Sequence, residues 1–215
     1  MDQPSPPFRR APKRHEPPGA PASLSRHAAV KTFFLEFLRA PTMVGSVIPT
    51  SQTVVRAMLA PVPWAQCRLF VEYGPGLGTF TRDILNRMAP DATLIAIDTN
   101  PRFVEHLRAT TTDPRLRVVH GSATDVQTII ARHGGGEADF ILSGLPFSTL
   151  PEGVGPSIMA ATHAALRPGG AFLVYQYSRF VWPLLKAHFA RIDEGLIWLN
   201  IPPCRTFMAW KDVQG

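Results

Sequence analysis

Apolar and polar positions follow two repeating patterns from about residue 51 onward. Segments with helical spacing of apolar residues alternate with short apolar runs typical of buried strands. The predicted helices cover 52–59, 80–88, a segment opening near Pro101, 125–132 and 156–166. The predicted strands cover 68–73, 93–98, 116–120, 139–143, 171–177, 196–200 and 206–210. This alternation predicts an α/β fold with a doubly wound, mostly parallel sheet and a C-terminal antiparallel hairpin.

The pattern is different before residue 51. Residues 1–23 are rich in Pro and basic side chains, and we expect a disordered tail there. Residues 24–215 are predicted to form one domain, which begins with an amphipathic helix over 25–39. Ala29, Phe33 and Phe37 recur at helical spacing in that segment. The pattern alone favours packing of this helix against the domain, and a membrane-surface helix is the alternative.

Composition narrows the possible partners and the compartment. The net charge of +6 suits anionic partners, either nucleic acid or an acidic membrane surface. No apolar run approaches the roughly 20 residues that span a bilayer, and no secretory signal is evident, so we expect a cytoplasmic protein. Cys67 and Cys204 have no metal-ligand spacing and form no disulfide framework. We therefore predict no metal, and two small core residues in a reducing compartment; no feature indicates an oligomeric state.

A glycine-rich turn follows the first predicted strand. It reads Gly74-Pro75-Gly76-Leu77-Gly78-Thr79, with Glu72 two places before it. Glycines permit a tight turn and close approach of a ligand to the backbone, and the next helix offers free N–H groups. Asp98 ends the second strand, where a carboxylate can accept both ribose hydroxyl protons. Asp98 could instead cap the helix at Pro101, a role that Asn100 could also fill. Together the two features favour a nucleoside cofactor.

The turn resembles the nucleotide-binding turn of class I methyltransferases. That resemblance implies S-adenosylmethionine as cofactor, whose cationic sulfonium suits a nearby carboxylate. In this class an acidic residue often bonds the adenine amino group, and Ser122 stands at that position here, with Asp125 three residues on. The residues expected to bind the cofactor are Glu72, Gly74, Pro75, Gly76, Gly78, Thr79, Asp98, Ser122 and Ala123.

The fourth predicted strand ends in the segment 143–147, which reads Ser-Gly-Leu-Pro-Phe. Methyl transfer to an amine is an in-line displacement, in which the enzyme mainly positions and desolvates the nucleophile. Backbone carbonyls and the Ser143 hydroxyl can be aimed at an amine from such a turn. The segment resembles the Asn-Leu-Pro-Tyr-type loop of amino-group methyltransferases that act on nucleic-acid bases. A simple Gly-Pro turn is the alternative. The predicted catalytic residues are Ser143, Gly144 and Leu145.

Further segments extend the resemblance. Ser-Gly-Leu-Pro at 143–146, Leu166–Gly170, Tyr175-Gln176-Tyr177, Asn200–Pro203 and Gly45–Ser51 are similar to the bacterial phospholipid N-methyltransferase family. The similarity covers about residues 25–210. It implies methylation of the amine of phosphatidylethanolamine towards phosphatidylcholine, by an enzyme attached peripherally to the inner face of the membrane.

The same resemblance suggests where the lipid phosphate binds. Tyr177, Arg179 and Arg205 are candidates, because a guanidinium bonds two phosphate oxygens with its planar fork. Arg179 stands where the family often has Tyr. The alternative for each Arg is a solvated surface charge. The lipid context also favours a membrane role for helix 25–39, because residues 1–40 hold seven Lys or Arg against three Asp or Glu.

Two other functions are compatible with parts of this pattern. An RNA adenine N-methyltransferase would use the same turn and the basic charge. We do not expect nucleic acid as a partner. Such enzymes carry a helical RNA-binding domain after the sheet, and no such helical pattern follows the last predicted strand here. They also have a base-stacking Tyr where this chain has Phe147. The other alternative is a non-enzymatic membrane-binding module of the same fold. The intact glycines, Glu72 and Asp98 argue against it.

Overall fold

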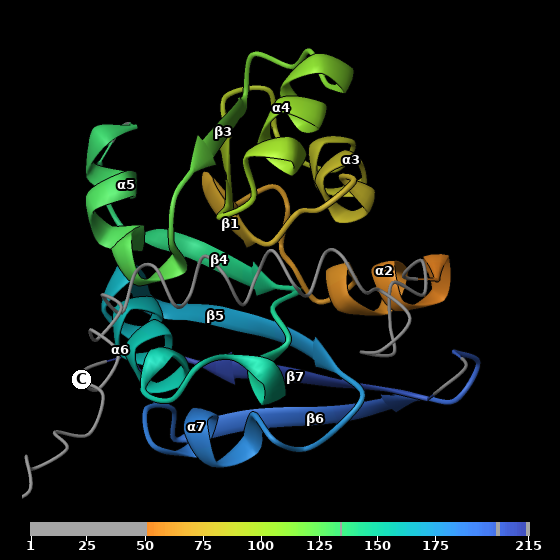
Figure 1. Ribbon diagram of the computed structural model, residues 1–215, viewed down its shortest axis with the longest axis vertical. Coiled ribbons are helices and arrows are strands. Elements are labelled where there is room, and N and C mark those ends of the chain that lie inside the picture. The colour runs from red at the N-terminus through yellow and green to blue at the C-terminus, as the bar shows by residue number, and fades with distance from the viewer. Residues whose placement is uncertain (1–50, 134, 201–202, 214–215) are drawn as a thin grey trace, which may run out of the picture.

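One seven-stranded sheet organises the protein. The computed structural model describes residues 51–133, 135–200 and 203–213, so the predicted tail and helix 25–39 lie outside the described residues. The strand order is β3-β2-β1-β4-β5-β7-β6, and Figure 1 shows it running from β3 at the top to β6 at the bottom. The strands are β1 (Leu69–Tyr73), β2 (Thr93–Asp98), β3 (Leu116–His120), β4 (Ala138–Ser143), β5 (Leu166–Gln176), β6 (Arg191–Ile197) and β7 (Cys204–Trp210).

Strand directions confirm the predicted fold class. The pairs β1–β2, β2–β3, β1–β4 and β4–β5 are parallel, whereas β7 is antiparallel to both β5 and β6. The sheet is therefore mostly parallel with a C-terminal antiparallel hairpin. Because β5 and β6 both oppose β7, these two strands run in the same direction. The ends of β1 to β6 thus share one edge of the sheet, here called the carboxyl edge.

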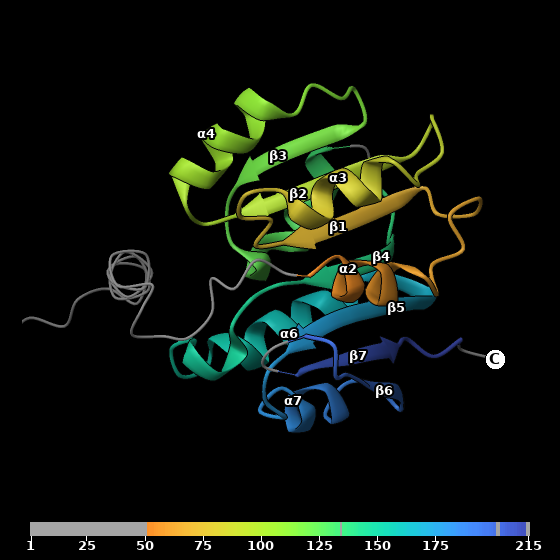
Figure 2. The ribbon, with the colours of Figure 1, turned by 90° about the vertical axis from the view of Figure 1, so that its right-hand side faces the viewer.

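Helices cover both faces of the sheet (Figure 2). They are α2 (Gln52–Leu59), α3 (Thr79–Leu85), α4 (Pro101–Thr110), α5 (Val126–Arg132), α6 (Val154–Ala165) and α7 (Trp182–Lys186), with short 3-10 turns η1 (Ala123–Asp125) and η2 (Phe147–Thr149). Alternate strand residues belong to two separate hydrophobic cores, as the period of two in a strand requires. One core joins the sheet to α2, α3 and α4; the other joins it to α5, α6 and α7.

Most element boundaries follow the hydrophobic pattern, and α2, β2 and β3 have the predicted bounds. Both cysteines are buried, as expected of core residues. Among the described residues, no helix combines the length and apolar character that crossing a bilayer requires.

The C-terminal hairpin and β5 depart from prediction. The predicted strand 196–200 is wrong beyond Ile197, because β6 spans Arg191–Ile197 and residues 198–200 form a turn. β6 is an edge strand that carries Asp193 and Glu194. Adjacent charged residues do not fit the apolar pattern used to predict strands, but they prevent an edge strand from pairing with another chain. β5 begins at Leu166, not 171, with a register irregularity in its pairing with β4. The five-residue helix α7 was not predicted, being too short to show helical periodicity.

Candidate active site

Three glycines shape the turn between β1 and α3. Gly74, Gly76 and Gly78 all have positive φ, the left-handed region that other residues rarely adopt. A Cβ added at Gly76 would meet nothing within 4 Å, whereas one at Gly78 would lie 2.7 Å from Leu107 Cδ1. Gly76 therefore leaves open space where a ligand can approach the backbone, and Gly78 allows the start of α3 to pack against α4.

Asp98 lies beside this turn at the end of β2. Its side chain is buried, and its carboxylate accepts hydrogen bonds from the backbone N–H of Asn100 (2.8 Å) and of Gly76 (3.4 Å). Burial raises the pKa of Asp98 despite these two bonds. The Asn100 side chain, not Asp98, caps α4 by accepting from the N–H of Arg102 (3.0 Å). The capping alternative for Asp98 is thus excluded, and Asp98 lines the pocket described below.

Glu72 lies beneath the turn, in the protein interior. Its Oε2 accepts a hydrogen bond from the Thr81 hydroxyl at 2.6 Å. Burial raises the pKa of Glu72 to about 7; the Thr81 bond opposes this shift and the Asp98 carboxylate adds to it. Glu72 does not line the pocket. Its charge can act on a bound cation only through the turn, and only at a pH at which the carboxyl is ionised.

A pocket opens at the carboxyl edge between the ends of β1, β2 and β3 and the N-terminal part of α6. Its lining from the three strand ends comprises Tyr73, Gly74, Ile97, Asp98, Thr99, Gly121, Ser122 and Ala123. The opposite wall is Leu145, Leu150, Pro151, Val154 and Ile158. Four predicted cofactor residues, Gly74, Asp98, Ser122 and Ala123, therefore meet in one cavity. Pro75, Gly76, Gly78 and Thr79 form the adjoining turn without belonging to the lining.

Ser122 lines the pocket as the sequence predicted, whereas the apolar wall from α6 was not predicted. The Ser122 hydroxyl caps η1: it accepts from the Thr124 N–H (3.2 Å) and lies 2.8 Å from the Thr124 hydroxyl. It thus has local partners where the class often has a carboxylate. The α6 side of the pocket was missed, because Val154 and Ile158 are ordinary apolar helix positions in the sequence.

The predicted catalytic turn after β4 is fixed by its own hydrogen bonds. Ser143 is fully buried, and its hydroxyl accepts from the N–H of Leu145 (3.2 Å). The Gly144 N–H donates to the Tyr73 carbonyl (3.0 Å). The Leu145 carbonyl accepts from Gln176 Nε2 at 2.6 Å. Of the three predicted catalytic residues, only Leu145 lines the pocket, while Ser143 holds the turn.

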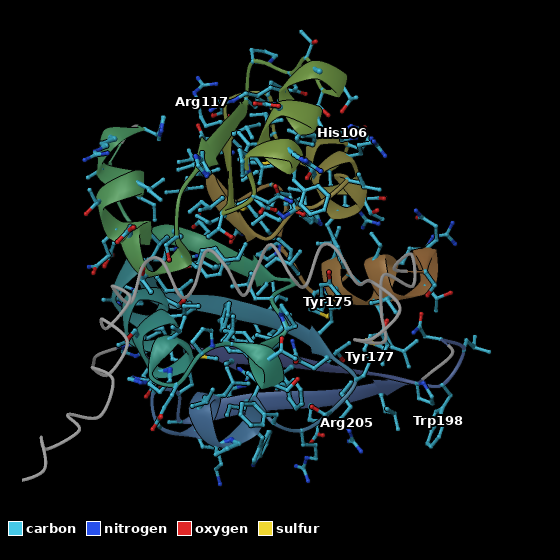
Figure 3. All side chains as sticks on the ribbon, viewed as in Figure 1. His106, Arg117, Tyr175, Tyr177, Trp198 and Arg205 are labelled. Atoms are coloured by element: carbon cyan, nitrogen blue, oxygen red, sulfur yellow. The ribbon has the colours of Figure 1, made fainter. Side chains whose placement is uncertain are left out.

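Tyr175 covers the other side of this turn. A Cβ added at Gly144 would lie 2.5 Å from the Tyr175 hydroxyl oxygen, so this position accepts only glycine in the present arrangement. The Tyr175 ring stacks on Phe80 at 5.0 Å between centroids. Figure 3 shows Tyr175 and Tyr177 near the end of β5. The Tyr-Gln-Tyr motif was visible in the sequence, but the contacts of Tyr175 and Gln176 with the turn after β4 were not.

The three predicted phosphate-binding residues divide between the two faces. Arg179 and Arg205 converge on Glu194, with N–O distances of 2.8 and 2.9 Å, and the Arg179 guanidinium lies 4.9 Å from the centre of the Trp182 ring. Tyr177 instead packs against the core beneath α2 and α3, and burial raises its pKa. The structure thus brings the two arginines together around one carboxylate. Glu194 partly neutralises the pair. It was missed because the sequence predicted a strand over 196–200, whereas β6 begins at Arg191.

The residues around the pocket fit S-adenosylmethionine. Open space above Gly76 admits a ligand against the backbone, and Asp98 offers a carboxylate to ribose hydroxyls at the end of β2. Glu72 can supply a second negative charge near a cationic group. An apolar wall at Val154 and Ile158 suits the uncharged parts of a nucleoside.

Known proteins resemble this chain in sequence. Residues 70–170 match the family described as "Methyltransferase domain". Ornithine lipid N-methyltransferase of Singulisphaera acidiphila is 31% identical over 185 residues, which cover 83% of this chain and 95% of that protein.

Solved structures share the fold at low sequence identity. N-methyltransferase NodS of Bradyrhizobium japonicum, in complex with S-adenosylhomocysteine, has a TM-score of 0.61 and 12% identity, covering 83% of this chain and 98% of that one. The 1,6-didemethyltoxoflavin-N1-methyltransferase of Burkholderia thailandensis, also with S-adenosylhomocysteine, has a TM-score of 0.59 and 19% identity, covering 93% and 94%. With the glycine turn, this evidence places the chain among the class I S-adenosylmethionine-dependent methyltransferases, in the family that contains ornithine lipid N-methyltransferase.

Proposed function

We propose that this protein transfers the methyl group of S-adenosylmethionine to the amine of phosphatidylethanolamine, towards phosphatidylcholine, at the inner face of a membrane. The match to ornithine lipid N-methyltransferase covers 95% of that protein, and its name gives a lipid substrate. This similarity supports a lipid amine as the acceptor. The observation that supports the proposal is the convergence of Arg179 and Arg205 on Glu194 in the hairpin, which is separated from the turn after β4 by β5.

The distance between the two features suits a small lipid head group. Arg205 stands at the start of β7, and β5 alone separates β7 from β4. Two strand spacings are roughly 10 Å, so the turn at Leu145 and the arginine pair are close neighbours along the carboxyl edge. Glu194 pairs with Phe207, which belongs to the same core as the pocket wall at Val154. One head group could therefore place its amine at the pocket and its phosphate at the arginines.

The surrounding residues can position and activate an amine. When bound, the cofactor supplies a methyl group on a sulfonium that is already electrophilic. The Leu145 carbonyl accepts hydrogen bonds from Gln176 Nε2 (2.6 Å) and from the Phe147 N–H (3.0 Å), which uses both of its lone pairs and fixes the turn beside which the amine would lie. The apolar side chains of Leu145 and Leu150, which line the pocket next to the turn after β4, disfavour the charged ammonium and exclude water. The chain thus favours the neutral amine, the form that can attack.

A second acceptor is favoured by a specific observation. The relative is named as an ornithine lipid N-methyltransferase, and an ornithine head group also offers an amine and an anion. An RNA adenine acceptor remains the alternative from another class.

One assay separates these substrates. Full-length protein and labelled S-adenosylmethionine are incubated with phosphatidylcholine vesicles containing phosphatidylethanolamine, with vesicles containing ornithine lipid, with phosphatidylcholine alone, or with RNA. We expect label in the lipid extract of the first sample. Label only in ornithine lipid would transfer the assignment to the second candidate, and label only in RNA would refute the lipid proposal.

The arginine pair is tested within the same assay. Arg205→Ala should raise the KM for the lipid about tenfold, through loss of a charge-assisted hydrogen bond of about 1.5 kcal/mol. Arg117→Ala is the matched control, because Arg117 lies on β3 at the opposite end of the molecule (Figure 3). Equal effects of the two substitutions would show that overall charge, not an anion site, is responsible.

We also propose that helix 25–39 attaches the protein to the membrane. Its sequence combines Phe33 and Phe37 with a basic polar side. Vesicle sedimentation should show salt-sensitive binding to anionic lipid that falls when both Phe residues become Asp. Undiminished binding of that folded double variant would refute the role of this helix.

A further inference from the structure

Exposed apolar side chains are concentrated at the carboxyl edge. Among the described residues, the large hydrophobic side chains that face solvent are Leu77, Phe180, Trp198, Leu199 and Val213, with exposed fractions of 56%, 54%, 73%, 83% and 73%. Leu77 lies in the turn after β1, Phe180 follows β5, and Trp198 and Leu199 follow β6. Only Val213 lies elsewhere, beyond the end of the antiparallel strand β7.

Residues 198–200, which follow β6, expose their apolar side chains and bury their polar one. Asn200 is a polar residue, yet only 3% of it is exposed, and its side chain bonds Tyr177. Trp198 and Leu199 immediately before it point into solvent. A turn that served only to connect two strands would be expected to expose the polar side chain and bury the apolar ones. Figure 3 shows Trp198 at the far end of the hairpin, away from the sheet.

We propose that the carboxyl edge docks on a lipid bilayer, with Trp198 and Leu199 entering the headgroup layer and Phe180 and Leu77 touching the same surface. This inference rests on the proposed function for its purpose, because it presents the methyl-transfer pocket to the layer that holds the lipid amine. The residues of this docking surface are distinct from those of the proposed membrane helix 25–39.

The spread of these residues favours a bilayer over a peptide or a small ligand. Leu77 follows β1 and Trp198 follows β6, four strand spacings away in the sheet, or about 19 Å. A broad, nearly flat partner can touch points this far apart along one edge. Trp is also the residue type enriched at membrane–water interfaces, where its ring and N–H match the headgroup level.

Charge at this edge is complementary to an anionic lipid surface. Arg179 is the neighbour of Phe180, and Arg205 pairs with Leu196, two residues before Trp198. Glu194 neutralises only one of the two guanidiniums, which leaves a surplus of one positive charge beside the apolar tip. Cationic side chains at this level add electrostatic attraction to the apolar contact.

Lipid-borne quenchers test the docking geometry directly. Full-length protein is mixed with anionic vesicles whose acyl chains carry bromine near the headgroup, and Trp fluorescence is recorded. We expect quenching in the wild type and a clear loss of quenching in Trp198→Phe, which still binds. Trp64, Trp182 and Trp210 are only partly exposed and should contribute little. Equal quenching in the two proteins would overturn the proposal, even if another segment dominates total binding.

Affinity and activity provide the second measurement. Trp198→Ser with Leu199→Ser should lower vesicle affinity about tenfold to a hundredfold, from the loss of two large apolar contacts. Val213→Ser is the matched control, because Val213 has the same exposed fraction as Trp198 but lies away from the edge. The double variant should keep the wild-type affinity for S-adenosylmethionine. Unchanged vesicle binding, or a loss of self-association without lipid, would refute a bilayer as the partner.

The two proposals can fail separately. If the wild type methylates no lipid while Trp198 is quenched by brominated vesicles, the proposed function fails and the docking surface stands. If lipid methylation is normal and the tip variants match the wild type in quenching and in vesicle activity, the docking proposal fails and the function stands.

Discussion

The turn after β1 and the turn after β4 lie on the same edge of the sheet, yet they are held in different ways. The first is shaped by backbone conformation, since Gly74, Gly76 and Gly78 adopt left-handed φ, and it rests on buried carboxylates. The second is fixed by side chains, with the Ser143 hydroxyl on one side and Gln176 on the other. We call the turn after β1 with Glu72 and Asp98 the cofactor half of the site, and the turn after β4 with Gln176 and the two arginines the substrate half. The cofactor half depends mainly on local sequence, whereas the substrate half depends on residues brought from distant strands.

Replacing Gly76 is the most drastic way to break the cofactor half. Gly76→Val should abolish measurable binding of S-adenosylmethionine, because its side chain would enter the open space above the turn. It should leave a folded protein, with a backbone strain of about 1–2 kcal/mol from a left-handed residue. Isothermal calorimetry measures the binding, and thermal unfolding measures the fold.

Gly78 gives the contrasting control within the same turn. Gly78→Val should destabilise the fold more than Gly76→Val, because its Cβ would collide with Leu107. If Gly76→Val binds the cofactor normally, the turn is not the cofactor site.

Glu72 tests how a buried carboxyl couples the cofactor half to pH. Its pKa is raised from 4.5 to about 7, so the folded protein binds this proton more tightly than the unfolded chain does. Its contribution to stability is therefore fully present below pH 4.5 and is lost as the pH rises through 7. The shift corresponds to about 3 kcal/mol. Glu72→Gln should approach that gain over the wild type at pH 8 and show little difference at pH 4.5.

Binding should show the opposite preference. Because ionised Glu72 favours a cationic cofactor, wild-type affinity for S-adenosylmethionine should rise with pH through 7, and the Gln variant should lack that rise. Denaturant unfolding and calorimetry across pH 4.5–8 supply the two measurements. A Gln variant that loses stability equally at both pH values would show that the Thr81 hydrogen bond, not desolvation, dominates.

Asp98 provides a smaller and more local test. Asp98→Ala should weaken binding of S-adenosylmethionine by about 1.5–3 kcal/mol, the effect of removing a charged partner of two hydroxyls. Because Asp98 also accepts from Gly76 and Asn100, the Ala variant is compared with Asp98→Asn. The Asn variant keeps one acceptor oxygen for the backbone and loses the charge. Unchanged calorimetric affinity in both variants would contradict the ribose assignment.

The same contrast explains what the sequence could predict. Glycines, a strand-end Asp98 and the bounds of β2 and β3 follow from residues close together in the chain. The pairing of Arg179 and Arg205 with Glu194 does not, because it depends on the register of an edge strand with a charged pattern. The pocket wall on α6 was equally hidden, since Val154 and Ile158 look like any core-facing residues. Local conformation was predictable here, and contacts between distant strands were not.

Glu194→Gln gives the smallest expected effect and sharpens the substrate half. The carboxylate bonds both arginines, so an incoming lipid phosphate must compete with it for their N–H groups. Removing its charge should lower the KM for phosphatidylethanolamine about twofold to fivefold, as expected for partly exposed ion pairs worth about 0.2–1 kcal/mol. Initial rates of methyl transfer at varied lipid content measure this change.

Asp193→Asn is the control for that substitution, because it removes the same charge from the adjacent position. Asp193 bonds Arg191 and the Trp210 indole on the other face of the hairpin, away from the arginine pair. It should leave the KM unchanged. If both substitutions lower the KM equally, the lipid responds to net charge alone. If Glu194→Gln raises the KM, Glu194 organises the two guanidiniums for the phosphate instead of competing with it, and the substrate half is built on a carboxylate in the same way as the cofactor half.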